Sequence, residues 1–90
     1  MTRDDFTPYA KSIEGKRIYA YANDHPPPHA HVRLDDGRDG TVLFHLVGGD
    51  PLPHRAYSRR ALRAWNALRP AVVPYLPELH AAFDRLNSHR

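Results

Sequence analysis

The sequence contains no cysteine. Disulfide bonds and thiolate metal sites are therefore excluded. Histidine, aspartate and glutamate remain as the strong metal ligands, and seven of the 90 residues are histidine. A metal site in this chain would have to use imidazole nitrogens and carboxylate oxygens.

Long apolar runs are also missing. No stretch approaches the roughly 18 residues that a membrane-spanning helix needs, so no membrane contact is expected. The first six residues, Met1–Phe6, lack the apolar segment of a signal peptide, which predicts a cytoplasmic location. With 41% hydrophobic and 26% charged residues, the composition is typical of a globular protein, and we expect residues 1–90 to form a single domain.

Acidic residues are absent between Asp50 and Glu78, where the sequence instead carries five arginines. Arginine suits bidentate contact with phosphate or carboxylate better than lysine does. The segment therefore indicates either a nucleic acid or acidic protein partner, or a solvated helix face that does nothing more. The candidate binding residues of this segment are Arg59, Arg60 and Arg63.

The first half of the chain predicts a sheet. Apolar residues at Phe6, Tyr9 and Ile13 favour one or two turns of helix that end at Glu14-Gly15. Segments rich in β-branched and aromatic residues, with polar and apolar positions alternating, then predict antiparallel strands. These strands are expected at residues 16–22, 29–34 and 41–47, with turns or loops at 23–28, 35–40 and 48–53.

The second half predicts helices. Ser58 is a suitable N-cap for a helix that runs to about Arg69, where Pro70 ends or kinks it. Prolines at 74 and 77 make a continuous helix through 71–77 unfavourable, and Pro77 suits the first position of a last helix to about Ser88. The expected fold is therefore α+β: a three-stranded antiparallel sheet followed by two or three helices packed on one face.

The strand pattern sorts side chains between the two faces of the sheet, because successive strand residues point to opposite sides. One face is apolar, and the helices should pack there: Ile18, Ala20, Ala22, Ala30, Val32, Val42, Phe44 and Leu46. The opposite face is polar, aromatic and basic: Arg17, Tyr19, Tyr21, His29, His31, Arg33, Thr41, Leu43 and His45.

The segment 23–33, Asn-Asp-His-Pro-Pro-Pro-His-Ala-His-Val-Arg, holds three of the histidines. Its prolines exclude a helix, so the histidines follow a stiff corner that leads into a strand. Side chains at His29 and His31 would lie roughly 6 to 7 Å apart at Cβ, close enough for both imidazoles to bind one zinc ion. The predicted metal ligands are His25, His29 and His31, and either Asp24 or His45 could complete the site.

The same residues also suit metal-free cleavage of RNA. Histidine titrates near neutral pH, so a pair can supply a general base and a general acid. This hypothesis makes His29, His31 and Arg33 catalytic, with either Arg33 or Arg17 at the phosphate. Tyr19 and Tyr21 would bind RNA by stacking on its bases. Two further interpretations stay open: a non-catalytic module that binds protein or nucleic acid, and a polar sheet face with no function.

The core Asp24-His25-x-Pro27-Pro28-His29-x-His31 resembles the hallmark of a family of small bacterial proteins, domain-of-unknown-function family 4160. The similarity extends to Gly49, Leu52-Pro53, Arg55 and Trp65, and covers most of residues 16–69. The extra Asp50-Pro51 and the proline-rich segment after Pro70 depart from the family pattern.

The resemblance implies a partner. Members of that family are commonly encoded beside another uncharacterised family, number 2442, in an arrangement like a toxin–antitoxin pair. It therefore implies a toxin–antitoxin-type component bound to a small cognate protein. It assigns no cofactor or catalytic residue. A three-stranded sheet would also have two open edges, so a homodimer is a further expectation.

Overall fold

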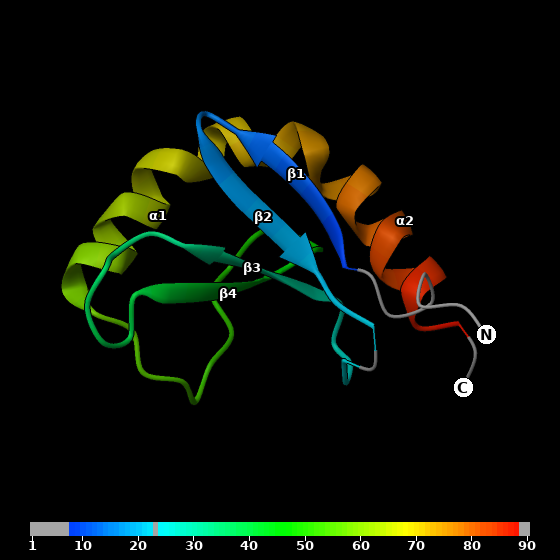
Figure 1. The fold of residues 1–90 in the computed structure, drawn as a ribbon, viewed down its shortest axis with the longest axis horizontal. Helices are drawn as coiled ribbons and strands as arrows, with labels where there is room; N and C mark the ends of the chain where they lie inside the picture. The colour runs from blue at the N-terminus through cyan, green and yellow to red at the C-terminus, as the bar shows by residue number, and fades with distance from the viewer. Residues whose placement is uncertain (1–7, 23, 89–90) are drawn as a thin grey trace.

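The fold, seen in a computed structural model that describes residues 8–22 and 24–88, is an antiparallel sheet with helices on one side (Figure 1). The sheet has four strands in the order β1-β2-β3-β4. The strands are β1 (Tyr9–Ile13), β2 (Lys16–Ala20), β3 (His29–Arg33) and β4 (Thr41–His45). The α+β class and the antiparallel sheet are confirmed, but the prediction of three strands was wrong.

The additional strand is β1, where the sequence pattern predicted a helix. The turn between β1 and β2 is formed by Glu14 and Gly15, which both have positive φ (53° and 79°). A two-residue turn with two positive φ angles matches the twist of a β-hairpin. Tyr9 and Ile13 share a face at a spacing of four in a strand as well as in a helix, so their spacing alone was ambiguous. Phe6, the third residue of the expected helix, lies outside the described residues.

The other three strands lie where they were predicted, although each is shorter. β2 ends at Ala20 rather than Ala22, and β4 ends at His45 rather than Val47. The chain after β4 turns back along that strand: the amide of Leu52 donates to the carbonyl of Leu43 (2.9 Å). This loop covers part of the outer edge of β4, so the expectation of two open sheet edges was wrong on this side. A homodimer through the β1 edge stays a prediction.

The helical part is one continuous run, so the prediction of two or three separate helices was wrong. It consists of α1 (Arg59–Val72), the 3₁₀ turn η2 (Val73–Tyr75) and α2 (Leu76–Leu86), with no loop between them. The Ser58 hydroxyl accepts a hydrogen bond from the amide of Ala61 (3.0 Å), which confirms the predicted N-cap.

Pro70 was predicted to end or kink the first helix, and the first of these alternatives was wrong. Pro70 lies inside α1 on its exposed side, where water can bond the Asn66 carbonyl that the missing proline N–H would have bonded. Pro74 and Pro77 lie in the first turns of η2 and α2, where an N–H has no helical partner to lose. Pro74 and Pro77 thus lie where α1, η2 and α2 follow one another, and neither proline interrupts the helical run.

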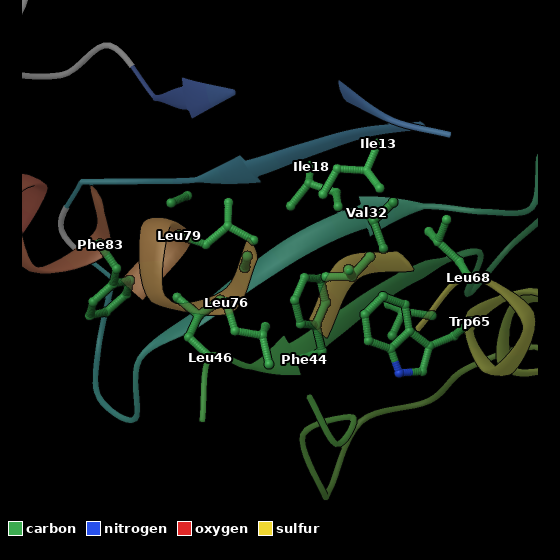
Figure 2. Close-up of a cluster of buried hydrophobic side chains, with 14 of the residues drawn as sticks. Ile13, Ile18, Val32, Phe44, Leu46, Trp65, Leu68, Leu76, Leu79 and Phe83 are labelled. Atoms are coloured by element: carbon green, nitrogen blue, oxygen red, sulfur yellow. The ribbon is translucent and has the colours of Figure 1, made fainter. Parts of the chain in front are cut away.

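The core lies between this helical run and the predicted apolar face of the sheet (Figure 2). Of the eight residues assigned to that face, seven are almost fully buried; Ala22 lies beyond the end of β2 and is half-buried. Helix α1 packs on β4, and α2 packs on β2 and β3. Trp65 fills the centre, where its ring stacks on Phe44 (centroids 4.3 Å apart). The predicted packing of helices on one face is confirmed.

No helix within the described part of the chain is both long enough and apolar enough to cross a bilayer.

Candidate functional site

The candidate site is a cluster of two imidazoles and one carboxylate at the start of β3. His29 and His31 alternate along the strand and share a face. The Nε2 atom of each lies 3.3 Å from the same oxygen, Oδ2 of Asp24. The three possible ligand atoms all lie within 4.8 Å of one another. The structure therefore brings together two of the three predicted metal ligands, with Asp24 as the third group.

The C-terminal end of α2 holds Asp24 in place. The side-chain oxygen of Asn87 accepts a hydrogen bond from the backbone N–H of Asp24 (3.0 Å). The side-chain nitrogen of Asn87 donates to the carbonyls of Tyr21 (3.1 Å) and Phe83 (2.9 Å). One amide side chain thus joins the end of the helix to the chain at Tyr21 and at Asp24.

The ring of His29 is fixed by a backbone contact. Its Nδ1 atom donates a hydrogen bond to the carbonyl of Pro27 (2.8 Å), because a carbonyl can only accept. In the neutral ring, Nε2 then carries a lone pair and no proton, and this lone pair faces the Asp24 carboxylate. Two acceptors that face each other can be bridged by a proton, carried by the ring or by the carboxyl, or by a metal ion.

One of the two histidines is buried and the other is half-buried. His29 is buried, and its ring packs against Phe83 of α2 (centroids 5.7 Å apart) and against His31 (5.2 Å). Burial lowers the pKa of His31 below its usual value, although the hydrogen bond to Asp24 acts in the opposite direction. The neutral form of His31, which is the form that binds metals, is therefore favoured.

The other two histidines considered as ligands lie outside this cluster. His25 is exposed and lines the pocket beside the cluster. In the described part of the chain, its ring nitrogens are not among the ligand atoms that converge with Asp24. His45 is half-buried and pairs with His29 across the ladder between β3 and β4. The structure therefore favours Asp24 over His25 as the third ligand beside His29 and His31.

The cluster opens onto a pocket of about 370 Å³. Its lining includes the three clustered groups, the apolar side chains Leu43 and Leu52, and Arg55. The exposed Arg55 was part of the basic segment in the sequence, but nothing in its spacing linked it to the histidines. Its position beside the cluster makes the pocket suitable for an anion.

The polar face of the sheet carries the predicted binding residues of β2 and the chain beyond it. Arg17, Tyr19, Tyr21, His31 and Arg33 line a second pocket of about 430 Å³ together with Thr41. Arg33 is held by hydrogen bonds to Thr41 Oγ1 (3.2 Å) and to the carbonyl of Asp36 (2.8 Å). The structure thus places Arg33, predicted as catalytic, and the two tyrosines beside His31.

The three predicted arginines of α1 lie elsewhere. Arg59, Arg60 and Arg63 are exposed on the helix, which covers the opposite, apolar face of the sheet. The structure does not bring them to the histidine cluster. Their role in binding stays a prediction.

Comparison with known proteins yields no relative: no family model, no curated protein and no solved structure matches the chain. The resemblance to family 4160 therefore stays a prediction from the sequence motif.

Proposed function

We propose that Asp24, His29 and His31 bind one divalent metal ion, with zinc as the best match, and that this centre binds an anionic ligand in its pocket. The observation that carries the proposal is the pair of 3.3 Å separations between the imidazole Nε2 atoms and one carboxylate oxygen. Both zinc and non-haem iron bind to a donor set of two imidazoles and one carboxylate.

The two nitrogen–oxygen separations fit tetrahedral coordination. Zinc binds histidine nitrogen and carboxylate oxygen at about 2.0 to 2.2 Å, so neighbouring ligand atoms of a tetrahedron lie about 3.3 to 3.5 Å apart. Both Nε2–Oδ2 distances agree with this value. An ion at this position would also bridge the lone pair of His29 and the carboxylate.

The surroundings match a metal centre as well. Ligating histidines in proteins commonly donate their second ring N–H to a backbone carbonyl or a carboxylate, as His29 does to Pro27. Three protein ligands leave a fourth position of the tetrahedron for water or a substrate. The pocket and the Arg55 guanidinium lie on the side where the cluster opens, which suits a phosphate or carboxylate group.

The geometry favours this function over metal-free acid–base catalysis by the same histidines. A general acid and a general base act on different atoms of the reacting group. Here the two Nε2 atoms instead converge on a single oxygen, and His29 is almost fully enclosed. A bound metal would supply Lewis-acid chemistry, while Arg55 would orient the anion.

Thermal unfolding with and without metal tests the proposal. We expect the purified protein to contain one zinc per chain, and its melting temperature to fall by about 10 °C or more on removal of zinc with EDTA. The reason is mass action: a ligand at 100 times its Kd stabilises the folded state by about 2.7 kcal/mol. In a chain of this size, each kcal/mol shifts the melting temperature by about 4 to 8 °C. Magnesium serves as the control, because it prefers all-oxygen sites and should not restore the lost stability.

An unchanged melting temperature, together with a protein that takes up no zinc, iron or other transition metal, would contradict the proposal. A role as a toxin–antitoxin component with a small cognate partner is a separate proposal, supported by the sequence resemblance alone.

A further inference from the structure

The open face of the sheet offers aromatic surfaces at a regular spacing. Tyr19 and Tyr21 lie two residues apart on one side of the chain, and their rings are nearly parallel (centroids 5.8 Å apart, 19° between planes). Tyr21 is 37% exposed, although most large apolar side chains are buried. The rings of Tyr21 and His31 meet nearly at right angles (centroids 4.7 Å apart, 86° between planes), which holds the Tyr21 ring in place. A flat, exposed ring of this kind is a surface on which a nucleobase can stack.

The same face carries positive charge. The guanidinium of Arg17 lies 5.9 Å from the centre of the Tyr19 ring. His31 lines all three neighbouring pockets on this side of the molecule, while Arg33 and Arg55 line two each. Three arginines therefore follow one hollowed surface that leads to the histidine cluster. The carboxylates along it are Asp24, which belongs to the cluster, and Asp39.

We propose that this face binds a single-stranded polynucleotide, with bases stacked on Tyr19 and Tyr21 and phosphates bound by Arg17, Arg33 and Arg55. Alternating stacking surfaces and cations match a chain in which bases and phosphates alternate, and small acidic metabolites would need only one of the two. A duplex would not fit, because its bases are stacked on one another and cannot reach the rings. One part of this inference rests on the proposed function, namely the contact of a phosphate with the metal centre.

Fluorescence anisotropy with labelled oligouridine and oligothymidine of about 12 nucleotides tests this inference. The protein is first treated with EDTA, so that binding to the face is measured without metal, and the titration is then repeated with saturating zinc. We expect binding that weakens steeply with salt, and that zinc tightens about tenfold or more because it adds two positive charges beside Arg55. The two oligonucleotides separate RNA from DNA as the source of the strand.

A charge-matched pair of variants locates the binding surface. The Arg17→Gln, Arg55→Gln double variant removes two exposed arginines from the open face, and Arg59→Gln, Arg63→Gln removes two from α1. We expect the first to weaken binding about tenfold or more, and the second to change it less than threefold. Tyr21→Ala, which keeps the net charge, is expected to weaken binding at least fivefold through lost stacking.

Three results would overturn the inference: no binding of either oligonucleotide, equal weakening by the two double variants, or unchanged binding by Tyr21→Ala. A zinc-stabilised protein that gives any of these would retain the proposed metal centre and lose only the polynucleotide. Conversely, face-specific binding in a protein that takes up no metal would support the polynucleotide site and contradict the metal centre. The two claims therefore fail separately.

Discussion

The Trp65→Ala variant is expected to lose about 3 to 5 kcal/mol of folding free energy. Trp65 is fully buried, its ring stacks on Phe44, and its Nε1–H donates to the carbonyl of Gly49 (3.1 Å). Alanine would leave a large cavity between α1 and the sheet and an unpaired carbonyl in the loop after β4. A chain of this length has a total stability of about 5 to 14 kcal/mol, so this loss removes a large share of it.

Urea denaturation measures this loss, and two variants serve as controls. Trp65→Phe keeps an aromatic ring on Phe44 and should cost clearly less than alanine, because a smaller cavity remains. Val47→Ala changes a side chain that is 71% exposed and should alter stability by no more than about 0.5 kcal/mol. A loss below about 1 kcal/mol for Trp65→Ala would contradict the packing between helix and sheet.

The second large effect is expected for zinc affinity. Replacement of His31 by alanine removes one of three protein ligands, and we expect the Kd for zinc to rise by a factor of 100 or more, since outer-shell losses alone reach that range. Isothermal titration calorimetry measures it, with circular dichroism as the check that each variant is folded. His25→Ala is the matched control: His25 lines the same pocket and was predicted as a ligand, but lies outside the cluster. The Kd of the His25→Ala variant for zinc should change less than threefold.

A third variant separates ligation from positioning. The Asn87 side chain bonds the backbone N–H of Asp24 and the carbonyls of Tyr21 and Phe83. Asn87→Ala should therefore raise the Kd for zinc by about 10- to 100-fold, between the effects at His25 and His31. A series in which His25→Ala costs as much as His31→Ala would contradict the assignment of the ligands.

The faces of the sheet were predictable because a strand places alternate residues on opposite sides. Ile18, Val32 and Phe44 could be assigned to the core, and Tyr19 and His31 to the open face, without knowledge of the strand register. The register itself, which pairs Tyr19 with His31, came only from the structure.

The errors in the fold came from local sequence patterns that did not determine the structure by themselves. The spacing of Tyr9 and Ile13 suits a helix or a strand, and only pairing with β2 decided between them. Pro70 usually ends a helix, but tertiary packing of Leu68 and Val72 on the core stabilises α1 on both sides of it. Local propensity was therefore overridden where long-range contacts were strong.

The histidine cluster was predictable only in part. The His29-x-His31 spacing indicated two ligands on one face, but the choice between His25 and Asp24 depends on how the proline corner turns. That turn is held by Asn87, 63 residues further along the chain, which no local pattern could reveal. Arg55 likewise reaches the pocket through the loop that returns along β4.

The most direct test of the metal centre is a crystal structure of the protein grown with zinc, with anomalous data collected at the zinc absorption edge. The proposed centre predicts one strong peak about 2.0 to 2.2 Å from Nε2 of His29, Nε2 of His31 and a carboxylate oxygen of Asp24. Zinc density confined to surface histidines such as His25 or His54, with none between Asp24 and the two imidazoles, would contradict it.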